Sequence, residues 1–276
     1  MKFPNLVAKV FHEPWLITPD RHRAIQDVLL ARLNAEEVLE PKAFLELPAR
    51  ESYRPAVETW APGVGAVQVN GVLGKRMSQV DLACGGCDID QVGEALAEAE
   101  GRSDLETVVV WFDSPGGTVT GIPELGAQVE RMGKTKRVVG YTDTLMASAA
   151  YWVGAQATDV VATPSAQVGS IGVYLALLDS SRAFEAEGLR VELFKAGKLK
   201  AAGMPGVEMT AEVREHFQAG VDEVYDDFRG AVSHRGLGQE VMEGQVFSGR
   251  AGAENGLVDF TVNGPAELVE VLRRLG

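Results

Sequence analysis

The sequence contains few of the residues on which the commonest catalytic and metal sites depend. It has four histidines and two cysteines in 276 residues. Histidine is the usual base for a nucleophilic serine, but none of the four lies in a predicted strand-to-helix loop. The cysteines form one C-x-x-C, Cys84 to Cys87, with no second pair to complete a zinc site. We therefore expect no Ser-His-Asp triad, no metal site or cofactor, and reduced thiols.

Positive charge and long apolar runs are also scarce. The chain carries 26 Lys and Arg against 39 Asp and Glu, a net charge of −13. Nucleic acids and anionic membranes both attract clustered Lys and Arg, so we expect neither as a partner. The first residues lack the apolar core of a signal peptide. The charge-free stretch 160–178 contains Pro164 and two glycines, which indicates buried strand and turn. We expect a cytoplasmic protein without a membrane anchor.

From Gly63 onward, strand-like and helix-like patterns alternate. A length of 276 residues with 46% hydrophobic content suits one large domain with an added arm. We expect a helical arm at 1–57, with a helix starting at Thr18-Pro19, and a main domain at 58–276. Alternation of strands and helices predicts an α/β fold with βαβ crossovers, a mostly parallel sheet and ligand sites at the carboxyl ends of strands. Strands are predicted at 64–73, 108–112, 137–141, 159–162, near 171 and at 191–194. Helices are predicted at 89–99, at 180–187, at 210–233 and just after 249. Two more helices are predicted, one that ends near 132 and one that starts at 148.

Three segments carry candidate chemistry. Thr144–Trp152, T-L-M-A-S-A-A-Y-W, places Ser148 among small residues that a peptide backbone can approach closely. Asp113–Gly117, D-S-P-G-G, offers backbone N–H groups without Cβ atoms in the way. Phe194–Lys200, F-K-A-G-K-L-K, holds three lysines. A lysine serves as a base only when burial or like charge lowers its pKa from about 10.4 toward about 7–8. The ordinary readings are a capping serine, a turn and solvated lysines.

In this order, the three segments resemble the signal peptide peptidase A family of serine proteases, a branch of the Clp-protease/crotonase fold. The resemblance implies that Ser148 is the nucleophile and that Lys200, in a G-x-x-K segment, is the general base. It also implies that Ser170, in a G-S-I-G segment at 169–172, hydrogen-bonds the lysine. The remaining alternative for Ser170 is a capping or turn serine.

The resemblance further implies an oxyanion hole formed by Gly117 and Ala149, with Gly116 in support. Two positions depart from the family pattern. Ala149-Ala150 replaces a frequent Gly-Gly, and Asp113 stands where asparagine is common. Neither change removes a catalytic atom, but both can reshape the pocket before the scissile bond. The family tends to prefer small or apolar side chains there, in an extended peptide.

In single-domain members of the family, the lysine reaches the serine of a neighbouring subunit in a ring, so we expect a homo-oligomer in which Lys200 completes a neighbour's site. The N-terminal segment F-H-E-P-W-L-I-T-P is similar to that of the minor capsid protein C type of phage head protease. This implies an ATP-independent serine endopeptidase acting on capsid or scaffold proteins, in the host cytoplasm or the phage prohead. Alternatives are a soluble bacterial peptidase that degrades signal peptides or oligopeptides, an inactive structural capsid component, and a crotonase-type acyl-CoA enzyme.

Overall fold

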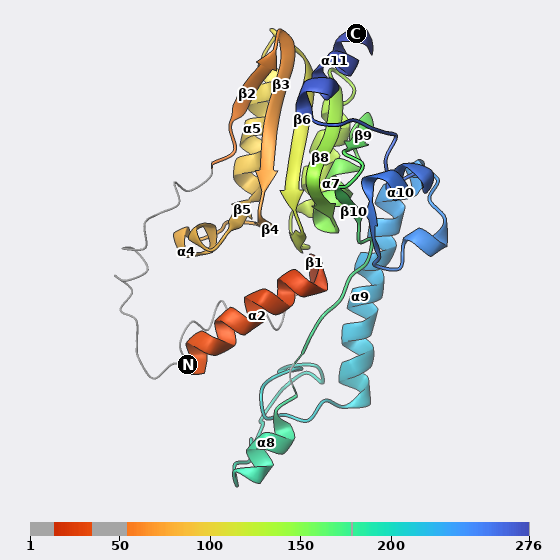
Figure 1. Ribbon diagram of the computed structural model, residues 1–276. Helices are drawn as coiled ribbons and strands as arrows, with labels where there is room; N and C mark the ends of the chain where they lie inside the picture. The colour runs from red at the N-terminus through yellow and green to blue at the C-terminus, as the bar shows by residue number, and fades with distance from the viewer. Residues whose placement is uncertain (1–13, 35–53, 178, 276) are drawn as a thin grey trace.

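A computed structural model describes residues 14–34, 54–177 and 179–275 (Figure 1). Its centre is an eight-stranded sheet with the strand order β11-β10-β8-β6-β3-β2, in which β9 pairs with β8 and β12 with β9. Only β2 and β11 pair in the antiparallel direction, so the predicted α/β fold with a mostly parallel sheet is confirmed. The strands are β2 (Val57–Ala61), β3 (Gly63–Asn70), β6 (Leu105–Ser114), β8 (Arg137–Ala147), β9 (Asp159–Ala162), β10 (Gln167–Gly169), β11 (Val246–Ser248) and β12 (Phe260–Thr261).

A second, four-stranded sheet lies beyond the carboxyl ends of β3 and β6. Its strands are β1 (Trp15–Ile17), β7 (Gly116–Thr118), β4 (Val72–Gly74) and β5 (Gly86–Asp88), in the order β1-β7-β4-β5. Strand β4 follows β3 after Gly71, and β7 follows β6 after Pro115. Two neighbouring strands of the main sheet therefore continue into the small sheet, which carries the glycine turn.

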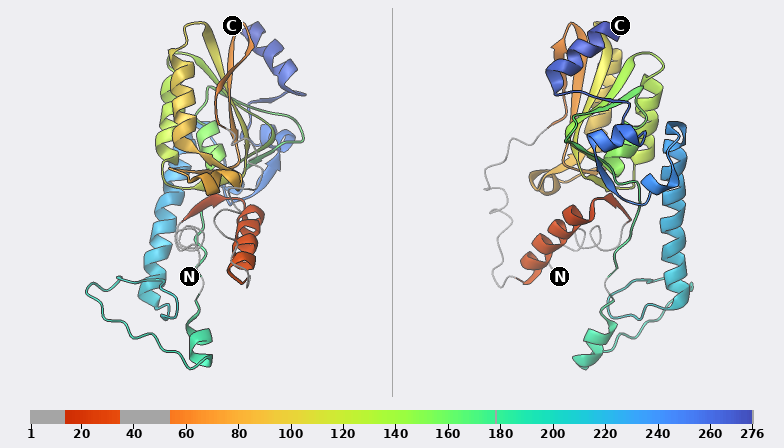
Figure 2. Two further views of the ribbon diagram at one scale, coloured as in Figure 1. Left: turned by 90° about the vertical axis from the view of Figure 1, so that its left-hand side faces the viewer. Right: turned by 45° about the vertical axis from the view of Figure 1, so that its right-hand side comes forward.

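Helices cover both faces of the main sheet (Figure 2). One face carries the larger core, where apolar residues of the sheet pack on α5 (Ile89–Gly101), α6 (Ile122–Met132), α7 (Ala149–Gly154) and α9 (Ala211–Val232). The helix predicted at 89–99 is α5, and Asp88 caps it, with its side chain accepting a hydrogen bond from the Asp90 amide. The other face packs on Leu268 and Leu272 of α11 (Pro265–Leu275). Because both faces of the sheet are covered, a site is expected at the strand ends.

One segment leaves the body of the molecule. Between β10 and α9, the chain runs away from the sheet, forms α8 (Ser181–Ala186) and returns along α9 (Figure 1). The strand predicted at 191–194 is wrong, because the chain there has no neighbouring strand to pair with. Phe194 is 92% exposed. The apolar pattern that suggested a strand belongs to an exposed excursion.

The short strand predicted near 171 lies instead at Gln167–Gly169, while other predicted helix starts agree with the structure. The arm helix α2 (Pro19–Asn34) begins at the predicted proline, and Thr210 caps α9. The other short elements are α4 (Gln79–Ala83), α10 (Gly249–Glu254) and two 3-10 turns at Ser233–Arg235 and Gln239–Val241. The rest of the predicted arm, residues 1–13 and 35–53, lies outside the described residues. Within the described ranges, no helix has the length and apolarity needed to cross a bilayer.

Candidate active site

The carboxyl ends of β6, β8 and β10 meet at one edge of the main sheet. Ser114 at the end of β6 pairs with Met146 of β8, and Ala147 at the end of β8 pairs with Gly169 of β10. Ser148 and Ser170 are the next residues of adjacent parallel strands. The register therefore brings the serine segment, the glycine turn and the G-S-I-G segment together, and the first two lie at strand ends as predicted.

Ser148 occupies a sharp turn between β8 and α7. Its φ of 56° and ψ of −120° lie in a region that non-glycine residues rarely adopt. The turn is held because the Ser148 amide donates to the Gly169 carbonyl at 2.7 Å and the Ser148 carbonyl accepts from the Trp152 amide at 2.9 Å. The residue is 1% exposed, and its Oγ has no hydrogen-bond partner. A strained serine between a strand and a helix is the geometry of a nucleophile elbow.

The glycine turn lies directly against this serine. A Cβ built on Gly116 would lie 2.9 Å from the Ser148 Cβ and 3.0 Å from the Ala149 amide nitrogen, and would overlap the Leu16 carbonyl oxygen. A Cβ on Gly117 would overlap the Leu73 carbonyl oxygen of β4. Neither position can hold a side chain without movement of backbone. The absence of side chains thus allows the turn and the serine to touch.

Ser114 holds the glycine turn in this position. Its hydroxyl donates to the Gly71 carbonyl at 2.7 Å and accepts from the Gly116 amide at 3.2 Å. The Gly116 N–H is therefore already used, which leaves the Gly117 and Ala149 amides as the candidate oxyanion donors. Sequence reasoning missed Ser114, although it stands inside the D-S-P-G-G segment that was singled out.

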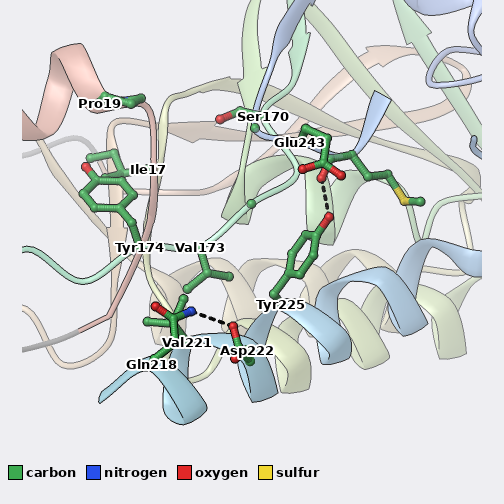
Figure 3. A pocket seen from close by; sticks show the side chains of 13 residues that line it. Ile17, Pro19, Ser170, Val173, Tyr174, Gln218, Val221, Asp222, Tyr225 and Glu243 are labelled. Atoms are coloured by element: carbon green, nitrogen blue, oxygen red, sulfur yellow. Dashed lines mark hydrogen bonds between the residues drawn. The ribbon is translucent and has the colours of Figure 1, made fainter. Parts of the chain in front are cut away.

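Ser170 lies beside Ser148 and is 4% exposed. Its φ of 54° is again positive, and its amide donates to the Gln245 carbonyl at 2.6 Å. Ser170 also lines a cavity of about 300 Å³ between β1, the 172–174 segment and α9. Figure 3 shows the cavity with Ile17 and Tyr174 on one side and Tyr225 of α9 on the other. The cavity gives access to Ser170 from the α9 side, where the exposed Asp222 and Glu243 lie.

Lys200 lies apart from these residues within the chain. It is exposed, and its amide donates to the Gly197 carbonyl in a turn of the excursion. An ion pair joins this segment to the start of α9, with the Lys198 Nζ 3.9 Å from the Glu212 Oε1. Figure 1 shows the excursion well away from the strand ends that hold Ser148. The structure therefore brings together Ser148, Ser170, Gly116, Gly117 and Ala149, but not Lys200.

The two cysteines have different surroundings. Cys84 is exposed after α4, whereas Cys87 is buried in β5. Burial raises the pKa of the Cys87 thiol from 9.0 to about 12. Cys87 packs within the larger hydrophobic core. Within the described ranges, no group of three or more His, Cys, Asp or Glu side chains is placed to hold a metal ion.

The strained serine, the glycine turn and the second serine thus lie together at the strand ends of a mostly parallel sheet. The sequence profile of peptidase family S49 matches residues 130–275. The chain belongs to peptidase family S49. This confirms the resemblance drawn from the three segments.

Individual relatives are also similar to the chain. A protein of Methanocaldococcus jannaschii that is named as a protease is 36% identical over 169 residues. These residues make up 59% of this chain and 54% of the relative. Capsid assembly protease C of Escherichia phage lambda is 24% identical over 98% of this chain and 65% of its own length. Head-tail preconnector protein GP5 of Enterobacteria phage P21 is 26% identical over 94% of this chain and 55% of its own length. The chain spans 54% to 65% of the length of these three relatives.

Proposed function

We propose that the protein is a serine endopeptidase in which Ser148 is the nucleophile. The observation that carries this proposal is the Ser148 turn, a strained and buried serine in direct contact with the glycine turn and beside Ser170. Strain of about 1–3 kcal/mol at such a residue persists only where surrounding structure imposes it, and it is frequent at active sites. A merely capping serine does not require this backbone conformation.

In the proposed reaction, Lys200 removes the proton from the Ser148 hydroxyl as its oxygen attacks a peptide carbonyl. The amides of Gly117 and Ala149 donate hydrogen bonds to the resulting oxyanion. Lys200 then gives the proton to the leaving amine, and water hydrolyses the acyl group on Ser148. Ser170 positions the lysine amine. Both Gly117 and Ala149 are held by fixed backbone, so their donors need no reorganisation during the reaction.

Because Lys200 lies apart from Ser148 in one chain, we propose that it completes the site of a neighbouring subunit. The excursion that carries Lys200 exposes four large apolar side chains to solvent. Leu189, Phe194, Leu199 and Met204 are 54%, 92%, 37% and 46% exposed. Large apolar side chains exposed along one segment favour a surface that another chain covers. The cavity beside Ser170 offers room for a side chain that arrives from outside.

We infer that the substrates are capsid or scaffold proteins of a phage. Two relatives that align along more than nine-tenths of this chain are named as a capsid assembly protease and a head-tail preconnector protein. Their similarity includes the arm, and not only the part matched by the family profile. Extended, unfolded segments of such proteins suit a site built at strand ends.

The test is the intact mass of an unfolded, casein-like substrate after incubation with the wild type, with Ser148→Ala and with Ser165→Ala. Ser165 is an exposed serine outside the site, so its variant is the matched control. We expect cleavage by the wild type and by Ser165→Ala, and none by Ser148→Ala. Equal cleavage by Ser148→Ala would exclude Ser148 as the nucleophile.

A further inference from the structure

The arm places a strand of its own in the candidate active site. Strand β1 pairs antiparallel with β7, with Trp15 opposite Thr118, Leu16 opposite Gly117 and Ile17 opposite Gly116. On its other side, the Trp15 amide donates to the Tyr174 carbonyl at 2.9 Å, and the Tyr174 amide donates back at 3.3 Å. Trp15, Leu16 and Ile17 are all buried, at 5%, 0% and 2% exposure. An extended, apolar segment thus lies between the glycine turn and the chain that follows Ser170.

The register sets one carbonyl of this strand over the nucleophile. The Thr18 amide donates to the Pro115 carbonyl at 3.1 Å. Hydrogen-bonded pairs alternate in an antiparallel ladder, so Leu16 and Gly117 form the next such pair, in which the Gly117 N–H faces the Leu16 carbonyl. The same oxygen overlaps the space that a Cβ on Gly116 would fill, next to the Ser148 Cβ and the Ala149 amide. The Leu16 carbonyl therefore lies where the carbonyl of a substrate peptide is expected.

This arrangement closes the site to any other peptide. Ser148 is 1% exposed while β1 is in place, so its hydroxyl cannot reach a carbonyl supplied from outside. Strand addition to a sheet edge is a common mode of peptide binding, in which the main chain supplies affinity and pockets for alternate side chains supply specificity. Strand β1 has both properties. Its aromatic residue Trp15 also packs on His22 of α2, with ring centroids 5.0 Å apart.

We propose that β1 is an internal, substrate-like occupant of the peptide groove, with Leu16 in the pocket before the scissile-bond position, and that external peptides bind only when β1 leaves. The proposal rests on the proposed peptidase function, but its tests measure binding and opening rather than cleavage. It defines the ligand as an extended peptide with an apolar residue at the position of Leu16. It gives the arm a role in controlling access to Ser148.

The first test measures binding of a fluorescent peptide with the sequence of residues 14–18, P-W-L-I-T, to the full chain carrying Ser148→Ala. Adding Leu16→Asp places a carboxylate where a fully buried leucine stood, which disfavours the docked strand. We expect the double variant to bind the peptide at least about ten-fold more tightly, since apparent affinity scales with the fraction of open sites. The matched control, Leu16→Met with Ser148→Ala, should bind no more tightly than Ser148→Ala. Equal affinity of the Asp and Met variants would overturn the proposal.

The second test needs no substitution in the arm and decides the matter if Leu16→Asp fails to fold. It measures amide hydrogen exchange in the Ser148→Ala chain at Trp15 and Thr18, and at Val109 and Val110 of the central strand β6. A displaceable strand opens without global unfolding. We therefore expect protection at Trp15 and Thr18 at least about a hundred-fold lower than in β6. Protection equal to that of β6 would show that β1 is a permanent part of the fold and would overturn the proposal.

Discussion

At the scale of single residues, the site depends on a glycine that no other residue can replace. Gly116 has a φ of +100°, and a Cβ there would meet the Leu16 carbonyl oxygen, the Ser148 Cβ and the Ala149 amide. We expect Gly116→Ala to lower the free energy of unfolding by about 1–3 kcal/mol through backbone strain and crowding. Urea unfolding measures the change.

The matched control is Gly220→Ala in the interior of α9, where a Cβ would meet nothing within 4 Å. Because glycine costs a helix about 0.5–1 kcal/mol relative to alanine, this variant should be more stable than the wild type. A Gly116→Ala chain as stable as the wild type would mean that the turn and Ser148 are not in the contact described.

The two cysteines should differ in reactivity for reasons of burial. The thiolate is the reactive form, and the pKa of Cys87 is raised to about 12. At pH 8, iodoacetamide should modify the exposed Cys84 and spare Cys87, as peptide mass mapping would show, while both react in denaturant. Equal modification of the two in the folded chain would contradict the buried position of Cys87.

The same pKa shift has a consequence for stability. Between pH 9 and about 12, the folded chain retains the Cys87 proton that the unfolded chain has lost. The contribution of this thiol to the free energy of unfolding should therefore be constant below pH 9 and fall as pH rises through that window. Urea unfolding of the wild type and Cys87→Ala at pH 8 and pH 10.5 measures it. The wild type should lose more stability than the variant over that interval, and equal losses would contradict the shift.

At the scale of elements, α9 packs on α7 through Phe228, near its C-terminal end. Phe228 is fully buried and stacks on Trp152 of α7, with ring centroids 4.8 Å apart. Phe228→Ala should destabilise the chain by about 3–5 kcal/mol through the cavity it leaves. Phe194→Ala, at a 92% exposed phenylalanine, should change stability by less than about 0.5 kcal/mol. Thermal unfolding compares the two, and similar losses would contradict the packing of α9 on α7.

Local sequence patterns predicted the elements that depend on local chemistry. Asp88 and Thr210 indicate where their helices begin, because a cap bonds to amides only a few residues away. Buried parallel strands such as β6 are continuous apolar runs. The parallel sheet then explains why the Ser148, Gly116 and Ser170 segments meet. Strand β1 could not be predicted in this way, because its three residues pair with β7 about a hundred positions away. The error at 191–194 arose because a short apolar pattern does not show whether a neighbouring strand is there to pair with.

At the scale of the whole molecule, the excursion around Lys200 exposes apolar side chains that no other described part of the same chain covers. If a neighbouring subunit covers it, Phe194→Asp should shift the protein to smaller assemblies in sedimentation velocity, because a charge is costly in an apolar interface. Val246→Asp, at a 39% exposed valine of β11, is the control and should leave the assembly unchanged. A wild type that sediments as a monomer at all concentrations would contradict a shared site.

The most direct test of the shared Ser148 and Lys200 site mixes two inactive chains. Ser148→Ala and Lys200→Ala are each assayed alone and then after co-expression, by the intact mass of a casein-like substrate. Lys195→Ala, at an exposed lysine of the same segment, is the control and should retain cleavage. We expect no cleavage by either variant alone and recovered cleavage by the mixture, since mixed assemblies contain some sites with both residues intact. A mixture as inactive as its components would contradict a lysine supplied by a neighbouring subunit.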